Sequence, residues 1–117
     1  MRKVIYIAGP FRSTTYYGQV ENIRRAEAVA LEVWRAGAAA LCPHLNTQNF
    51  QGALHDEVWL EGDLALLHKC DAILMMERWD QSRGAREERF YAMLRRMPIL
   101  YGIEDCQRWL VDQKQAA

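Results

Sequence analysis

The sequence has no excess of charge of either sign. Its 117 residues include 15 Lys and Arg and 15 Asp and Glu, so the formal net charge at pH 7 is zero. A protein that holds a nucleic-acid polymer through its phosphates needs a broad basic surface, and this balance argues against one. Any anion site is therefore expected to be local, and a single nucleotide fits better than a duplex.

Cysteine is scarce and long apolar runs are missing. Cys42, Cys70 and Cys106 are odd in number and form no CxxC spacing, which argues for buried, reduced thiols in a cytosolic protein rather than a disulfide framework. The apolar run after the basic N-terminus, residues 4–8, is too short for a signal sequence or a membrane span. We expect a cytoplasmic protein with no membrane partner.

Several well-known motifs are also absent. No GK[ST] follows Gly9, the Gly9 loop is no dinucleotide fingerprint, and there is no G-x-S-x-G nucleophile elbow. His44, His55 and His68 are too far apart for a recognised zinc spacing and have no cysteine pair beside them. We therefore expect neither a metal nor a cofactor.

What is present is an alternation of short apolar strands and amphipathic helices. In order, the pattern predicts strand 3–8, helix 21–36, strand 38–42, helix 57–69, strand 72–76, helix 85–97, strand 99–101 and helix 105–114. This alternation implies right-handed crossovers and helices on both faces of a parallel sheet. We predict one α/β domain over residues 1–117, a small doubly wound, flavodoxin- or Rossmann-like sheet of four to five parallel strands.

Three polar segments follow the predicted strands and can converge at one sheet edge. GPFRSTTYYG (9–18) offers hydroxyls, a guanidinium and backbone N–H groups that suit a phosphate, although an ordinary solvated loop has the same composition. PHLNTQNFQG (43–52), which we expect to be a loop, offers amide and imidazole groups that read hydrogen-bonding edges. The third, WDQSRGAREE (79–88), carries Ser82 and two glutamates.

Ser82 and the glutamates allow more than one interpretation. Ser82 is a natural N-cap, and a helix N-terminus can also take a phosphate. Glu87 and Glu88 can simply complement the helix dipole. Asp63, within a leucine-rich helix, is the kind of aspartate that usually faces solvent.

Helical geometry separates the two sides of the 85–97 helix. At about 100° per residue, Glu88 shares a side with two small residues rather than with the large apolar ones. If the small side packs on the sheet, Glu88 is held near the strand ends and the large face is left for a partner subunit. The small side is Ala85 and Ala92, and the large face is Phe90, Met93, Leu94 and Met97.

Taken in order, four segments resemble the nucleoside 2-deoxyribosyltransferase superfamily, over about residues 3–101. They are YIAGPFR (6–12), PHLNTQNF (43–50), DLALLHKCDAILMM (63–76) and S-x-G-x-x-x-E (82–88), followed by Ala92. The sequence is most similar to small phage and bacterial members and also resembles the nucleoside 5′-monophosphate N-glycosidases. The resemblance implies cleavage or transfer of the N-glycosidic bond of a (deoxy)nucleoside or its 5′-monophosphate through a covalent glycosyl-glutamate.

By this resemblance Glu88 attacks C1′, Asp63 helps to protonate or position the leaving base, and Tyr6 orients Glu88 through its hydroxyl. Ser82 falls where the nucleotide hydrolases have a phosphate-binding serine and the deoxyribosyltransferases commonly have an aspartate, which favours a 5′-phosphorylated substrate and hydrolysis. Phe11 or Trp79 would stack on the base. The other substrate-binding residues implied are Gly9, Arg12, Ser13, His44, Asn46 and Gly84.

The chain departs from the family pattern at two places. Phe90 stands where the family often has a glycine, and Pro10 removes one N–H from the expected phosphate loop. Because family members build their sites near subunit interfaces, the resemblance also implies a homodimer or larger assembly. The alternatives are a non-catalytic nucleotide-binding or regulatory protein on the same fold, and a protein-interaction module that uses its apolar helix faces.

Overall fold

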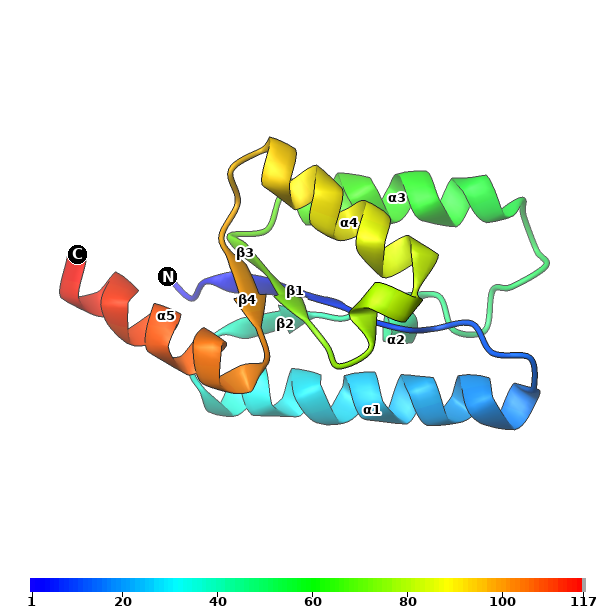
Figure 1. Cartoon of the computed structure of the whole chain (residues 1–117), viewed down its shortest axis with the longest axis horizontal. Coiled ribbons are helices and arrows are strands. Elements are labelled where there is room, and N and C mark those ends of the chain that lie inside the picture. The colour runs from blue at the N-terminus through cyan, green and yellow to red at the C-terminus, as the bar shows by residue number, and fades with distance from the viewer. Residues whose placement is uncertain (117) are drawn as a thin grey trace.

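The computed structural model describes residues 1–116 and forms a four-stranded parallel sheet in the order β2-β1-β3-β4 (Figure 1). Its elements are β1 (Val4–Ala8), α1 (Tyr16–Arg35), β2 (Ala39–Leu41), α2 (Pro43–Asn46), α3 (Asp56–His68), β3 (Ala72–Met75), the 3₁₀ turn η1 (Trp79–Gln81), α4 (Arg83–Leu94), β4 (Ile99–Tyr101) and α5 (Ile103–Ala116). The predicted α/β architecture is confirmed, with four strands.

Alternate side chains of the central strands face opposite layers of helices. Ile5, Ile7 and Leu74 pack in one core with α1 and α5, whereas Tyr6 and Ile73 pack in a second core with α3 and α4. Figure 1 shows α1 on one side of the sheet and α3 and α4 on the other. Burial on both faces explains why β1 and β3 are continuous apolar runs rather than alternating ones.

Two segments that the sequence predicts to be loop, the one before residue 21 and the one after residue 42, contain helical turns. Helix α1 begins at Tyr16 rather than at residue 21, because the Thr15 side chain accepts a hydrogen bond from the Gly18 N–H at 2.9 Å and caps the helix. The segment 43–52 is not entirely loop, since Pro43 opens the short helix α2, a position that proline favours.

The ends of α4 and α5 also differ from the prediction. Helix α4 stops at Leu94, three residues early, because Arg96 adopts a left-handed φ of 56° and the Met97 N–H bonds back to the Ala92 carbonyl at 2.9 Å. Helix α5 starts at Ile103 rather than at residue 105, with two acidic residues in its first turn that favour a helix start.

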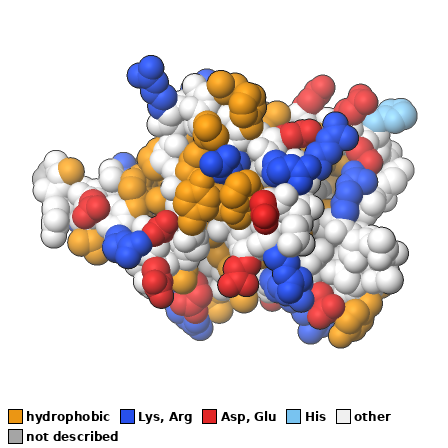
Figure 2. Space-filling model, in the orientation of Figure 1, with side chains coloured by type: hydrophobic (Ala, Val, Ile, Leu, Met, Phe, Trp, Pro, Cys, Tyr) orange, Lys and Arg blue, Asp and Glu red, His pale blue; other side chains and the backbone are white. Residues whose placement is uncertain are grey.

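The three cysteines are free and buried, as the sequence predicts. None of the helices described in residues 1–116 is long and apolar enough to cross a bilayer. Of the large apolar side chains on the surface, Phe90, Met93 and Leu94 of α4 are 59%, 48% and 68% exposed. Figure 2 shows hydrophobic side chains gathered over this part of the molecule.

Candidate active site

The centre of the candidate site is a hydrogen bond between the sheet and α4. Tyr6, fully buried in β1, donates its hydroxyl to Oε2 of Glu88. The short side chains of Ala85 and Ala92 are buried against the sheet, so the backbone of α4 comes close to the strands. The expectation from helical spacing is confirmed for the small side of α4, which packs inward with Glu88, and for Phe90, Met93 and Leu94, which remain exposed. It is wrong for Met97, which lies beyond the end of α4 and packs against the core under the sheet.

Asp63 belongs to the same group. Asp63 lies on α3, the helix that packs against α4, and its charge is a further cause that raises the pKa values of both Tyr6 and Glu88. Nδ1 of His68 lies 2.7 Å from the Tyr91 hydroxyl and joins the same two helices. We call Tyr6, Asp63 and Glu88 the carboxylate cluster.

The carboxylate cluster strongly perturbs its own protonation. Burial is the main cause that raises the pKa of Glu88 to about 8; the Tyr6 hydrogen bond lowers it, while the charges of Asp63 and Glu87 raise it further. Burial also raises the pKa of Asp63 to about 6. The pKa of the Tyr6 phenol is raised, first by burial and then by Glu88 and Asp63, so it stays protonated as a donor. Two carboxyl groups with displaced pKa values are typical of catalytic sites.

The start of α4 lies beside this cluster along the helix. Ser82 is the N-cap, as predicted: its Oγ accepts a hydrogen bond from the Ala85 N–H at 3.2 Å. Gly84 lies in the first turn, and a Cβ added there would meet no atom within 4 Å. The N-terminal turn of α4 is thus open on the Gly84 side.

The loop after β1 is engaged in contacts of its own. The Arg12 guanidinium forms an exposed ion pair with Asp56 at 2.7 Å, which joins the loop to the first turn of α3. The Ser13 hydroxyl lies against the Gly18 backbone, where a Cβ would approach it to 2.1 Å. At Gly9, a Cβ would lie 2.6 Å from the Met76 sulfur. Gly9 is therefore required for the close approach of the chain after β1 and β3.

His44 is buried and holds the same loop. Its Nε2 lies 2.8 Å from the Pro10 carbonyl oxygen, and because a carbonyl only accepts, Nε2 is the protonated nitrogen. Burial lowers the pKa of the ring, so the neutral form is favoured. The Phe11 ring meets the His44 ring edge-on, with centroids 5.2 Å apart. Asn46 is exposed at the end of α2.

Trp79 lies in a cluster that the sequence did not reveal. The Arg89 guanidinium covers the Trp79 ring at 4.8 Å from its centroid and donates from Nε to the Tyr101 hydroxyl at 2.8 Å. One face of Trp79 is therefore already occupied, and η1 is braced against the end of β4. No signal in the sequence pairs these residues, since they come from three different elements.

The structure thus brings together Tyr6, Asp63 and Glu88 and leaves part of the predicted set elsewhere. A groove of about 460 Å³ lies between the start of α1 and segment 48–51. Ser13 is the predicted site residue that lines it, and Glu88 and Asp63 lie outside it. Within the part of the chain that the structure describes, no group of three or more His, Cys, Asp or Glu residues is placed to hold a metal ion.

Comparison with known proteins agrees with this architecture. A family model described as "Domain of unknown function (DUF4406)" matches residues 3–101, the range over which the motifs resemble the deoxyribosyltransferases. No curated protein matches the chain in sequence.

Solved structures share the fold at low identity. A 2-deoxyribosyltransferase from Bacillus psychrosaccharolyticus has a TM-score of 0.61 at 19% identity, with 84% of this chain and 70% of that chain covered. A conserved protein from Enterococcus faecalis V583 has a TM-score of 0.69 at 17% identity and coverages of 86% and 63%. A 2-desoxiribosyltransferase from Leishmania mexicana has a TM-score of 0.61 at 22% identity, with 85% of this chain and 63% of that chain covered. The chain spans less than two thirds of the last two proteins, and the likeness establishes a common fold.

Proposed function

The chain belongs to the DUF4406 family, a deoxyribosyltransferase-like family, and from this premise we propose that it cleaves or transfers the N-glycosidic bond of a (deoxy)nucleoside or its 5′-monophosphate. The observation that carries the proposal is the Tyr6 hydroxyl donating to Glu88, with Asp63 electrostatically coupled to both. This arrangement supplies a held carboxylate and a second carboxyl group, the two parts that a retaining glycosyl transfer needs.

In the first step a carboxylate oxygen of Glu88 attacks C1′ of the sugar. The bond between C1′ and the base nitrogen breaks, its electron pair leaves with the base, and Asp63 supplies the proton that neutralises the base. Tyr6 positions Glu88 because its phenol is fixed in a central strand. The product is a glycosyl ester on Glu88 and a free base.

In the second step water attacks C1′ and the ester bond breaks, so its electron pair returns to Glu88 as a carboxylate. Asp63 takes the proton that the water loses. A second base can take the place of water, and the outcome is then transfer rather than hydrolysis. The first step requires a single proton on the carboxyl pair, held by Asp63, and the second step returns that proton to Asp63. Because the pKa of Glu88 is the higher of the two, the form with the proton on Asp63 is the minor one before attack.

A 5′-phosphate fits the start of α4 better than the β1–α1 loop. Ser82 is partly exposed at the N-cap and Gly84 leaves open space beside the first turn, where helix N–H groups favour an anion. Arg12, in contrast, is already paired with Asp56. We therefore favour a nucleoside 5′-monophosphate as substrate and hydrolysis as the main reaction.

We further propose that a second copy of the chain covers the exposed apolar face of α4. Phe90, Met93 and Leu94 lie together on the exposed side of α4, and Glu88 lies on the opposite side, so the subunit contact would lie across the helix from Glu88. Light scattering of the wild type and of Leu94→Glu tests this: a dimer that the variant converts to a monomer supports it, and a monomeric wild type contradicts it.

The function is tested by incubating the protein with nucleosides and their 5′-monophosphates and measuring free base. Wild type should release base, and Glu88→Ala should lower the rate by about a thousandfold or more. Glu87→Ala is the matched control, because Glu87 is the exposed neighbour whose partner is Arg83. Failure of every substrate to release or exchange its base would contradict the proposal, and saturable nucleotide binding without release would instead indicate a regulatory protein.

A further inference from the structure

One buried polar atom has no partner in the structure. The indole nitrogen Nε1 of Trp59 is shielded from solvent, yet no atom of residues 1–116 accepts its hydrogen. Leaving a buried N–H unsatisfied costs free energy, so such groups are rare in native proteins and commonly indicate a missing ligand or water.

Trp59 lies on the face of α3 that carries Asp63. The two residues are four apart in one helix, so their side chains lie on the same side of it, one turn from each other. Leu67, four residues further on, is fully buried against the sheet. Trp59 therefore stands at the N-terminal end of an inward row in which Asp63 is the member coupled to Tyr6 and Glu88.

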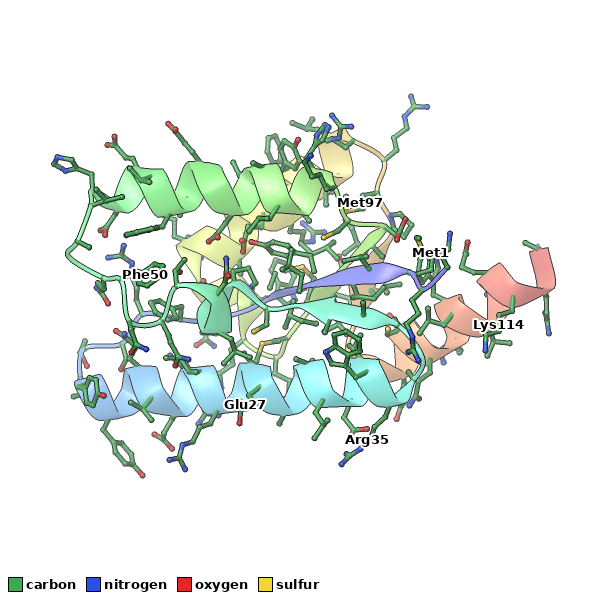
Figure 3. All side chains as sticks on the ribbon, turned by 180° about the vertical axis from the view of Figure 1, so that it is seen from behind. Met1, Glu27, Arg35, Phe50, Met97 and Lys114 are labelled. Atoms are coloured by element: carbon green, nitrogen blue, oxygen red, sulfur yellow. The ribbon has the colours of Figure 1, made fainter. Side chains whose placement is uncertain are left out.

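An aromatic side chain lies beside Trp59. The Phe50 ring is tilted by 41° from the Trp59 ring, with centroids 5.9 Å apart. Phe50 belongs to the segment between α2 and α3 and is labelled in Figure 3. The one polar group of this aromatic pair is the Trp59 N–H, which donates and never accepts. A ligand that takes this hydrogen must displace the atoms that now shield Nε1.

Resting on the proposed function, we infer that Trp59 is a specificity-determining residue that donates its indole N–H to an acceptor atom of the leaving base. The acceptor is a ring nitrogen or a carbonyl oxygen conjugated with the glycosidic nitrogen. As the bond from C1′ breaks, the electron pair enters the base and this acceptor becomes more negative, so the hydrogen bond strengthens in the transition state. A base that carries an amino group at this position should bind poorly, because its N–H groups would face the Trp59 N–H, which is also a donor.

The matched variant is Trp59→Phe, which keeps an aromatic ring and removes the N–H. We expect kcat/KM for base release to fall about tenfold, the worth of one hydrogen bond that the transition state uses. The melting temperature should stay the same or rise, since an unsatisfied buried donor is lost. Trp34→Phe is the control, because Trp34 is a half-exposed tryptophan on α1.

A direct readout is the ¹⁵N–¹H spectrum of the indole groups. The signal missing in Trp59→Phe identifies Nε1, and titrating Glu88→Gln protein with each of the four common deoxynucleoside 5′-monophosphates should move that signal downfield with the nucleotide that wild type cleaves best. The Trp34 signal should stay in place.

The outcomes separate this inference from the proposed function. Base release with an unmoved Trp59 signal, or with unchanged kcat/KM in Trp59→Phe, overturns the role of Trp59 and leaves the reaction intact. A moved signal without base release supports Trp59 as a base-binding residue and overturns the catalysis. Absence of both release and any nucleotide-dependent shift overturns both.

Discussion

The carboxylate cluster and the loop after β1 show two ways of holding polar side chains in place. Tyr6 and Glu88 come from a central strand and from a helix packed on it, and both are held by buried neighbours. Arg12, in contrast, is held by one exposed ion pair. A side chain packed among buried neighbours has few alternative conformations, whereas an exposed ion pair is weak and either partner can be replaced by another charged group. The cluster is therefore suited to chemistry, and the loop to adjusting when a ligand arrives.

The largest effect within this comparison should come from removing the hydroxyl that links sheet and helix. Tyr6→Phe keeps the buried ring and deletes the donor to Glu88. We expect kcat to fall about 100-fold, as for other groups that orient a reacting side chain. The pKa of Glu88 should also rise, because the Tyr6 hydrogen bond is what lowers it. Kinetics over a pH series measures both, and a lower kcat with an unmoved pH profile would contradict the orienting role.

The second prediction concerns the free energy of unfolding. Folding raises the pKa of Glu88 from 4.5 to about 8, so between these pH values the unfolded chain loses its proton while the folded chain keeps it. The contribution of protonated Glu88 to the free energy of unfolding is thus fully present below pH 4.5 and is lost as the pH rises to about 8. Glu88→Gln does not titrate and should be more stable than wild type by about 2 kcal/mol at pH 8, allowing for partial exposure.

Denaturant unfolding at several pH values checks this. The advantage of Glu88→Gln over wild type should shrink toward zero at acidic pH. Glu87→Gln provides the control: Glu87 is exposed, and its charge is the smallest of the causes that raise the pKa of Glu88. The free energy of unfolding of this variant should depend on pH nearly as that of wild type does. An advantage that is constant with pH would mean that a difference in packing or hydrogen bonding, rather than a buried charge, separates the variant from wild type.

The same pKa values predict a bell-shaped dependence of kcat/KM on pH. The carboxyl pair binds one proton between about pH 6 and about pH 8, and the two apparent values belong to the pair. Activity should fall about tenfold per pH unit outside this range. In Asp63→Asn the alkaline decline should disappear, because Glu88 alone then titrates and must be ionised. An alkaline decline that survives in Asp63→Asn would remove Asp63 from the proton transfer.

The contrast between packed and exposed elements also explains what the sequence could predict. Residues 72–76 form a continuous apolar run, typical of a buried strand, and the apolar residues of 85–92 have the spacing of an amphipathic helix. The sheet, the helices and the side of α4 that carries Glu88 can therefore be predicted from the local sequence. The hydrogen bond from Tyr6 to Glu88 joins residues 82 positions apart, and only the family resemblance pointed to it.

Other contacts depend on tertiary structure that local patterns do not encode. The Arg12–Asp56 pair, the bond between His44 and the Pro10 carbonyl, and the stack of Arg89 on Trp79 each join two loops or two elements. From the sequence, Arg12 and His44 were expected to be available to bind a substrate. In the folded chain they are already in use, because the ends of parallel strands bring unrelated segments together.

The smallest effect should come from the ion pair itself, and it tests how exchangeable the loop contacts are. The side chains of Arg12 and Asp56 are 64% and 50% exposed, so breaking their pair should change stability by less than about 1 kcal/mol. Asp56→Ala removes a negative charge and frees the guanidinium, and the KM for a nucleoside 5′-monophosphate should fall about two- to fivefold while the KM for the unphosphorylated nucleoside stays the same. Glu21→Ala, which breaks the exposed pair with Arg25 on α1, should change neither KM. Equal changes for both substrates would mean that Arg12 shapes the loop rather than binding phosphate, and the phosphate would then depend on Ser82 and the start of α4 alone.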